Sequence, residues 1–251
     1  MTDLVRHDIV AETDAQMRET GAYVAPHAQI VRATHLGETV FFTVDNPRDV
    51  IQSEHLAGRF YELEELAIIQ RYFPLGGRFL DIGANVGNHS VYLAKFLRAS
   101  RVAMVEPNPL AIPLLQANIF LNGLEAVCER GYLGYGLSDG AVETATIRTG
   151  NNNLGGARVK EGAGDVPLRT GDALFGDQAF DLIKIDVEGM EMKVLAGMRS
   201  YLAARPTRIF IEVDKVNYDA FDEWIGANGY RVLEEFQRYP TNKNFMIEPG
   251  A

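Results

Sequence analysis

The segment Arg78–Gly87 reads RFLDIGANVG and joins a short apolar strand to a glycine-containing turn. Gly83 and Gly87 stand four residues apart, and glycine adopts turn conformations that other residues avoid. The spacing differs from the G-x-G-x-x-G pattern of dinucleotide oxidoreductases, and the G-x-x-x-x-G-K-[ST] pattern of phosphate-binding loops is absent. The segment therefore predicts a strand–turn–helix unit that differs from both of these nucleotide-binding motifs.

Strand-like and helix-like stretches alternate on the C-terminal side of this unit. Continuous apolar strands are expected at 78–82, 101–105, 126–133, 181–187 and 208–213, and helices at 60–73, 88–97, 110–121, 188–202 and 221–228. Further strands are expected at 38–44 and 142–147, with a closing antiparallel pair at 230–236 and 244–248. Because apolar strands that alternate with helices are buried on both faces, we expect an α/β fold with a Rossmann-like, doubly wound, mostly parallel seven-stranded sheet.

Composition narrows the class of protein. The chain has 251 residues, and 34 acidic against 24 basic side chains give a net charge of −10, whereas a nucleic-acid binder needs a basic surface. An anionic acceptor would also need a local basic patch, which the sequence does not show. A single cysteine, Cys128, excludes a disulfide framework or a cysteine-rich metal site. No apolar run approaches the ~18 residues of a membrane span.

The N-terminal residues lack the apolar core of a signal peptide, so we expect a cytoplasmic enzyme. We divide it into an N-terminal extension at 1–59 and a catalytic domain at 60–251. The polar, glycine-rich stretch NNNLGG at 151–156 is expected to be a mobile loop. Together with the segment before residue 60, it is expected to cover the acceptor, because loops at the mouth of a rigid sheet usually carry specificity.

Ligands of open parallel sheets bind beyond the carboxyl ends of the strands. Glu106 ends the second strand 19 residues after Gly87, where a carboxylate can accept hydrogen bonds from a ribose diol. Asp81 lies two residues before the first glycine, where it can contact an ammonium group that S-adenosylmethionine carries and that NAD lacks. The order Asp81, Gly83, Gly87, Glu106 therefore predicts a nucleoside-containing cofactor and favours S-adenosylmethionine.

Five segments together resemble the FkbM-type methyltransferase family: FLDIGANVGNHSV (79–91), VEPNP (105–109), NIFLNG (118–123), LSDG (137–140) and IKIDVEGME (183–191). The resemblance covers roughly 60–247. It implies a class I methyltransferase fold, S-adenosylmethionine as cofactor and, usually, O-methylation of a small molecule, a sugar or a lipid-linked glycan. The cofactor-binding residues that it implies are Asp81, Gly83, Ala84, Asn85, Gly87, Glu106, Pro107, Asn108, Leu137, Ser138 and Asp186.

The resemblance also implies a role for most of these residues. Asp81 and the turn after it cradle the methionine part of the cofactor, and Glu106 holds its ribose. Asn108 flanks the nucleoside, Leu137 and Ser138 lie beside the adenine, and Asp186 lies next to the sulfonium.

A hydroxyl acceptor is a poor nucleophile, so a general base is expected to take its proton. Asp186 and Glu188 follow the strand at 181–187 and are our candidate catalytic residues, although Glu188 could instead stabilise the N-terminus of the next helix. His89 is a further candidate base, with a surface or packing role favoured for it. Lys184 lies inside an apolar strand, so we expect it to reach a carboxylate, because an unpaired buried ammonium is costly.

The carboxylate oxygens of Asp186, Glu188 and Glu212 are hard ligands of the kind that Mg²⁺ accepts. The sequence does not show that they converge, and no metal is predicted. Two alternative functions stay open: an NAD-dependent oxidoreductase and a non-catalytic nucleoside-binding module. The sequence leaves open the acceptor, the identity of the base and the oligomeric state.

Overall fold

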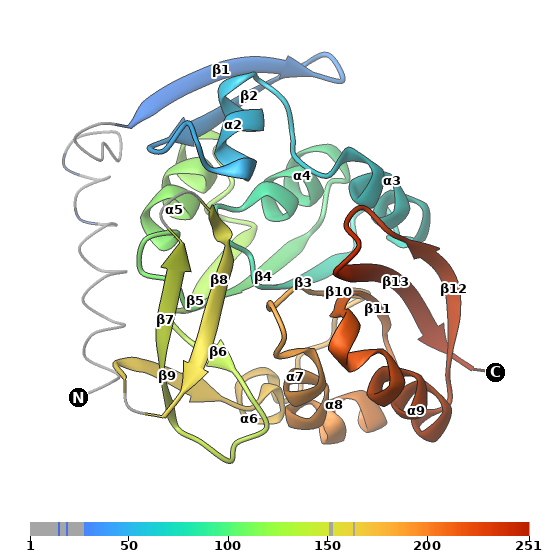
Figure 1. Cartoon of the computed structure of the whole chain (residues 1–251). Coiled ribbons are helices and arrows are strands. Elements are labelled where there is room, and N and C mark those ends of the chain that lie inside the picture. Colours follow the sequence, from blue (N-terminus) through green and yellow to red (C-terminus); the bar gives the residue numbers. More distant parts are fainter. Residues whose placement is uncertain (1–14, 16–18, 20–27, 151–152, 163, 251) are drawn as a thin grey trace.

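The computed structural model describes residues 15, 19, 28–150, 153–162 and 164–250, with a seven-stranded sheet at the centre (Figure 1). The order of its strands is β12-β13-β11-β10-β3-β4-β5. Five neighbouring strands pair in parallel, namely β11, β10, β3, β4 and β5. The strand β13 runs antiparallel to both β11 and β12. This confirms the predicted mostly parallel sheet. The bounds are β3 Arg78–Ile82, β4 Arg101–Glu106, β5 Cys128–Leu133, β10 Leu182–Ile185, β11 Arg208–Asp214, β12 Tyr230–Phe236 and β13 Asn242–Pro249.

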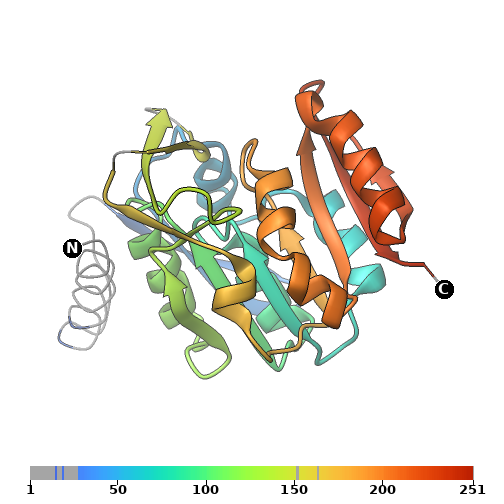
Figure 2. The ribbon, with the colours of Figure 1, turned by 90° about the horizontal axis from the view of Figure 1, so that it is seen from below.

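Helices cover both faces of the sheet, as Figures 1 and 2 show. Neighbouring strand residues alternate between two cores: Phe79 belongs to one and Leu80 to the other. This explains why the central strands read as unbroken apolar runs. One layer contains α3 (Leu63–Tyr72), α4 (Asn88–Phe96) and α5 (Ile112–Leu121). The other contains α6 (Gly171–Phe175), α7 (Glu191–Gly197), α8 (Arg199–Ala204) and α9 (Tyr218–Asn228), which follows the short 3₁₀ helix η1 (Lys215–Asn217).

The prediction of one helix over 188–202 is wrong in two respects. The helix begins at Glu191, because Glu188 and Gly189 adopt positive φ angles of 50° and 99° and form a turn. It is then interrupted at Met198, which separates α7 from α8. A Cβ at Gly197 would lie 2.1 Å from the Ser138 carbonyl oxygen, so the end of α7 approaches a neighbouring backbone closely.

The described part of the N-terminal region consists of β1 (Gln29–His35), β2 (Glu38–Val44) and α2 (Val50–Leu56). The strand predicted at 38–44 is confirmed. The ring of Phe42 of β2 contacts that of Phe60 edge to face, with the ring centres 5.0 Å apart, and joins the same core as α4 and α5. The backbone N–H of Thr43 donates to Asn118 Oδ1 at 2.6 Å. These contacts join the hairpin β1–β2 to the sheet domain.

A second, four-stranded sheet follows β5 in the chain. Its order is β6-β9-β7-β8, with bounds β6 Gly136–Leu137, β7 Thr144–Gly150, β8 Asn153–Glu161 and β9 Val166–Arg169. The predicted loop at 151–156 is wrong for 153–156, which form the start of β8, while 151–152 lie outside the described residues. Pairing with β7 imposes the strand despite the asparagines and glycines. The backbone N–H of Leu154 also donates to Asp49 Oδ2 at 2.6 Å and so ties β8 to α2.

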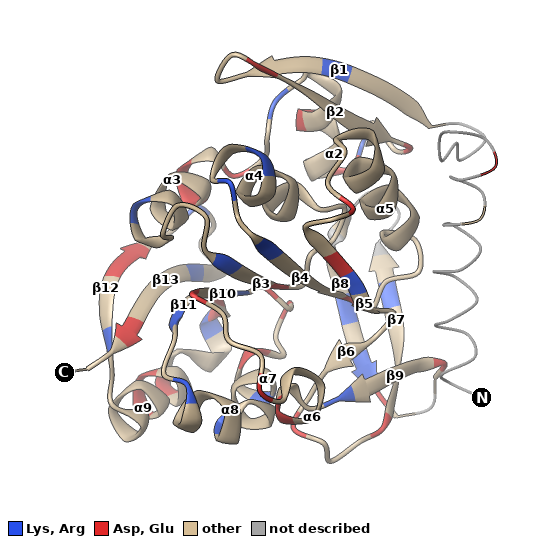
Figure 3. Cartoon of the chain, turned by 180° about the vertical axis from the view of Figure 1, so that it is seen from behind, with Lys and Arg blue, Asp and Glu red and all other residues tan. Residues whose placement is uncertain are grey.

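Several Lys and Arg residues belong to the hairpin β7–β8, and their positions along the ribbon are blue in Figure 3. Arg148 and Arg158 are register partners, and Lys160 lies two residues further along the same exposed face. The structure therefore assembles a local basic patch that the sequence did not reveal. Within the ranges described above, no helix is both long enough and apolar enough to cross a bilayer.

Candidate functional site

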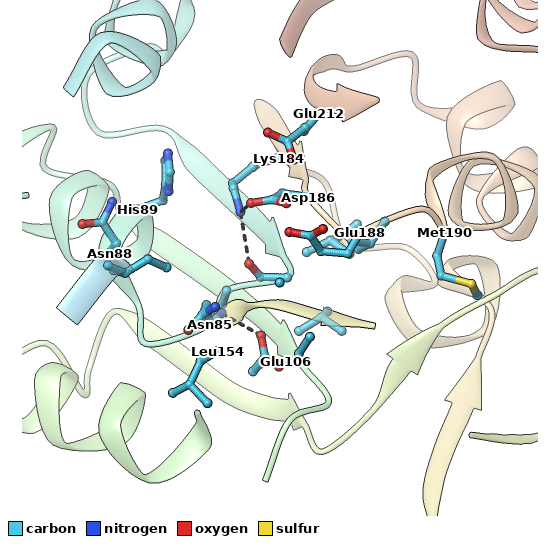
Figure 4. Close-up of a pocket in the computed structure, with 18 of the residues that line it drawn as sticks. Asn85, Asn88, His89, Glu106, Leu154, Lys184, Asp186, Glu188, Met190 and Glu212 are labelled. Carbon is cyan, nitrogen blue, oxygen red and sulfur yellow. Dashed lines mark hydrogen bonds and ion pairs between the residues drawn. The ribbon is translucent and has the colours of Figure 1, made fainter. Parts of the chain in front are cut away.

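A cavity of about 370 Å³ opens at the carboxyl ends of β3, β4, β10 and β11 (Figure 4). The turns that follow these strands form its floor. Residues of α2 and β8 form another wall, including Ile51 and Leu154. Tyr239 and Asn242 complete the rim, and the hydroxyl of Tyr239 lies 3.0 Å from that of Tyr61. Ile51 and Leu154 belong to the two segments that the sequence led us to expect over the acceptor. Sequence reasoning missed Tyr239 and Asn242, because they come from a distant segment without a ligand pattern.

The turn after β3 adopts the conformation that its glycines permit. Gly83 has a φ of 80°, and a Cβ there would lie 1.8 Å from the Asp186 carbonyl oxygen. The close neighbour that requires glycine is therefore the end of β10. Gly87 caps α4 with a φ of 85°, and its missing side chain faces Leu115 of α5. Asn85 has a φ of 49° and lines the cavity, and its buried Oδ1 has no hydrogen-bond partner.

Glu106 presents a fixed carboxylate on the cavity wall. Its side chain accepts hydrogen bonds from the backbone N–H groups of Asn85 and Asn108, each at 2.7 Å. Burial is the main cause that raises the pKa of Glu106 to about 7, against the lowering effect of these two bonds. Ala84 and Pro107 line the cavity beside it. Asn108 is buried behind the wall and does not line the cavity, and its Nδ2 has no partner.

Lys184 lines the cavity and reaches two carboxylates. Its Nζ lies 3.2 Å from Asp186 Oδ2 and 3.4 Å from Asp81 Oδ1, and it donates to the Gly83 carbonyl oxygen at 3.0 Å. The predicted pairing of Lys184 with a carboxylate is confirmed. Asp81 also accepts from Ser90 Oγ at 2.6 Å, is fully buried and is absent from the cavity lining. Asp81 therefore pairs with Lys184. The prediction that its carboxylate faces the cofactor cavity is wrong.

Leu137 and Ser138, the two residues expected beside the adenine, differ in their position relative to the cavity. Leu137 lines the cavity, and so does Gly136 before it. Ser138 is fully buried behind the lining, and its Oγ donates to Glu161 Oε1 of β8 at 2.7 Å. The hydroxyl of Ser138 thus joins the residue after β6 to β8, and Ser138 does not line the cavity.

Three carboxylates converge on the side of the cavity opposite Glu106 (Figure 4). One carboxylate oxygen each of Asp186, Glu188 and Glu212 lies within 4.8 Å of the others. Burial is the main cause that raises the pKa of Glu188 to about 8 and that of Glu212 to about 10, and the charge of Asp186 raises both further. The sequence named these residues as possible ligands of one ion, but only the fold brings them together.

Glu188 does not begin a helix. It occupies a left-handed turn three residues before α7 and lines the cavity. The acidic side chain in the first turn of α7 is Glu191, whose carboxylate accepts from the backbone N–H of Gly189 at 2.6 Å and from Asn217 Nδ2 at 2.6 Å. Stabilising the N-terminus of the helix was the alternative role for Glu188, and in the structure Glu191 occupies the position for it.

Glu62 and His89 form a further part of the wall. Glu62 has a φ of 57°, and its pKa is raised to about 8, first by burial and then by the charge of Asp186. The Nε2 of His89 lies 3.9 Å from Glu62 Oε2 and has no hydrogen-bond partner. His89 is only 5% exposed, and burial holds its pKa well below the ordinary value of 6.5. It lines the cavity and does not lie on the outer surface.

Comparison with known proteins places this chain in a family. Residues 81–232 match the model of the methyltransferase FkbM domain. A similar curated protein is the AMB antimetabolite synthetase AmbE of Pseudomonas aeruginosa, which is 27% identical over 312 aligned positions. That alignment covers 98% of this chain but only 14% of the length of AmbE.

Solved structures agree on the fold. A protein of the NADB-Rossmann superfamily from Streptococcus agalactiae superposes with a TM-score of 0.51 at 14% identity, over 74% of this chain and 68% of that one. The tRNA m1G37 methyltransferase of M. jannaschii gives 0.50 at 16% identity, over 90% and 56%. The family model spans more than half of the sequence, and the chain therefore belongs to the FkbM methyltransferase domain family.

Proposed function

We propose that this chain transfers the methyl group of S-adenosylmethionine to a hydroxyl oxygen of a small molecule, a sugar or a glycan. The observation that carries the proposal is the arrangement of carboxylates in one cavity. Glu106 stands on one side, and Asp186 and Glu188 stand on the other (Figure 4). The first position suits a ribose diol, and the second suits the reacting groups.

The cavity lining fits this cofactor. The turn at 83–87, Glu106, Pro107 and Leu137 would hold its nucleoside and methionine parts. The free Oδ1 of Asn85 is a buried acceptor that a ligand donor would satisfy, since buried polar groups are normally hydrogen-bonded. When bound, S-adenosylmethionine supplies an electrophilic methyl group on a sulfonium.

The carboxylates opposite Glu106 account for the proton of the acceptor. Asp186 is fixed by the ammonium of Lys184, so one of its oxygens is held in place and the side chain can orient the acceptor. Glu188 has its pKa raised to about 8, which makes its ionised form a stronger base than an ordinary carboxylate. We therefore assign orientation to Asp186 and proton removal to Glu188.

Isothermal titration with S-adenosylhomocysteine and with NAD tests the cofactor assignment. We expect heat with S-adenosylhomocysteine only. Glu106→Gln should weaken this binding by about 10- to 100-fold, because hydrogen bonds to a charged group are lost. The exposed Glu125→Gln is the matched control and should bind normally. Heat with NAD alone would support the oxidoreductase alternative and contradict the proposal.

The acceptor class is tested by transfer of a radiolabelled methyl group. We expect label on the oxygen of a hydroxylated small molecule or sugar. Because the hairpin β7–β8 carries a basic face, tRNA is included as a second acceptor. Transfer to tRNA with none to any hydroxylated small molecule would contradict the proposed acceptor.

A further inference from the structure

We propose that Asp186, Glu188 and Glu212 bind a divalent cation, and that this cation binds the hydroxyl oxygen of the acceptor. The second part of the inference rests on the proposed methyl transfer, whereas binding of the cation does not. Four observations carry the proposal: the spacing of the oxygens, the incomplete compensation of their charge, a buried imidazole in the same cavity and the chemistry of the donor set.

The spacing of the oxygens suits one ion. Asp186 and Glu188 follow β10, and Glu212 belongs to the carboxyl half of the neighbouring strand β11. The three donor oxygens lie within 4.8 Å of one another. Oxygen ligands lie about 2.0–2.6 Å from Mg²⁺ or Ca²⁺, so two ligands of one ion can be separated by up to roughly 4–5 Å. The three side chains can therefore reach a common ion without movement of the backbone.

The cations beside the cluster, Lys184 and Arg158, compensate its charge only in part. Among the described residues, neither Glu188 nor Glu212 has a side-chain hydrogen bond or ion pair. Lys184 contacts Asp186 through one carboxylate oxygen and divides its charge between Asp186 and Asp81. Because like charges in a partly buried site repel strongly, carboxylates this close must either keep protons or share additional positive charge, and a divalent cation would supply that charge.

His89 supplies an independent observation. Its side chain is more than nine-tenths buried, lines the same cavity and has an Nε2 without a hydrogen-bond partner. Its Nε2 lies 3.9 Å from Glu62 Oε2, and in Figure 4 its ring stands across Lys184 from Asp186. A buried imidazole nitrogen is costly unless it has a partner. An oxygen bound to a cation, from either water or the acceptor, would provide that partner.

The donor set decides the class of ion. All three ligands are carboxylates, which select hard cations such as Mg²⁺, Mn²⁺ and Ca²⁺ over softer ones. Three protein ligands leave coordination positions open for water and an acceptor. A cation in this place would lower the pKa of a bound hydroxyl. One oxygen of Glu188 is enough for the ion, so the other can take the proton, and the lowered pKa of the bound hydroxyl would offset the weaker basicity of a coordinated carboxylate.

Titration of the full chain with Mn²⁺ after EDTA treatment tests the site, because Mn²⁺ replaces Mg²⁺ and is visible by electron paramagnetic resonance. We expect one Mn²⁺ per chain. Glu212→Gln should weaken its affinity at least about 10-fold, because a charged oxygen ligand is lost. Glu223→Gln removes the same charge from an exposed position on α9 and should leave the affinity unchanged. Equal affinities for the wild type and Glu212→Gln, or no stoichiometric binding by the wild type, would overturn the site.

Two parallel measurements separate this inference from the proposed function. Affinity for S-adenosylhomocysteine reports on the cofactor site alone. If the chain binds S-adenosylhomocysteine but does not bind Mn²⁺, the cation site is overturned and the proposed methyl transfer still stands. Methyl transfer that is lost in EDTA and restored by Mg²⁺ supports the role in acceptor binding. Methyl transfer that is unaffected by EDTA overturns that role. Urea denaturation of Glu212→Gln confirms that the variant is folded, and Glu188→Gln repeats the test at a second ligand.

Discussion

Lys184 and Asp81 are register partners on β10 and β3, and the Nζ of Lys184 lies 3.4 Å from Asp81 Oδ1 in a place that solvent hardly reaches. The ammonium is 3% exposed and the carboxylate is fully buried. Lys184 lines the cavity, Asp81 is buried behind it, and the ammonium of Lys184 holds the Gly83 carbonyl oxygen and the Asp186 carboxylate in position. It therefore links the first glycine turn to the candidate catalytic residue.

Replacing Lys184 with Met should destabilise the protein by about 3–5 kcal/mol, because removal of one partner leaves a buried charge uncompensated. Urea denaturation followed by circular dichroism measures this loss. The control is Lys243→Met, which breaks a solvent-exposed pair with Glu235 and should cost at most about 1 kcal/mol. Equal costs for the two variants would show that the buried pair does not stabilise the fold.

Gly83→Ala should be more damaging than Gly123→Ala, although both glycines have positive φ angles. A Cβ at Gly83 would overlap the Asp186 carbonyl oxygen at 1.8 Å, whereas nothing lies within 4 Å of a Cβ at Gly123. The second variant should therefore show only the backbone strain, about 1–2 kcal/mol. The first should lose several kcal/mol, since it also forces β3 and β10 apart. Comparable denaturation midpoints would contradict the close approach of the two strand ends.

The sequence predicted the central sheet well, because each central strand is buried on both faces. The strand expected at 78–82 has the bounds of β3, and the strand expected at 101–105 is one residue short of β4. Prediction from local composition failed where the pairing of strands determines the structure. Asn153 begins β8 because its segment pairs with β7, in spite of asparagines and glycines that favour a loop.

The candidate site was only partly predictable for a similar reason. Asp81 has the expected place along the chain, but the orientation of its carboxylate depends on Lys184 of a neighbouring strand. The hydroxyl of Ser138 is likewise used by Glu161 of β8. Convergence of Glu188 and Glu212 depends on the order of β10 and β11 in the sheet, which strand spacing along the chain does not encode.

Stability in EDTA should fall as the pH rises from 7 to 8. The pKa values of Glu62 and Glu188 are raised to about 8 and that of Glu212 to about 10, so these carboxyls retain protons in the folded state. The same groups are ionised in the unfolded chain at this pH. Because the folded state then binds more protons, the free energy of unfolding decreases with pH, by at most about 1.4 kcal/mol per unit for each group.

The window above pH 7 avoids an opposing contribution from histidines. Burial lowers the pKa of His55 to about 4, which makes stability rise with pH only up to its ordinary value of 6.5. Urea denaturation at several pH values between 7 and 8 should give a shallower slope for Glu212→Gln than for the wild type. The exposed Glu223→Gln should keep the wild-type slope. Three identical slopes would mean that Glu212 is already ionised in the folded protein.

Asp186→Asn should reduce kcat by about 100-fold or more, because the charge that orients the acceptor and faces Lys184 is lost. Lys184 keeps Asp81 and the Gly83 carbonyl oxygen as partners, so the denaturation midpoint should change little. Affinity for S-adenosylhomocysteine should stay within a few-fold, as Glu106 is untouched. Single-turnover transfer to the hydroxylated acceptor measures the effect, with the exposed Asp219→Asn as the matched control. A variant with normal turnover would remove Asp186 from the mechanism and leave Glu188 as the catalytic carboxylate.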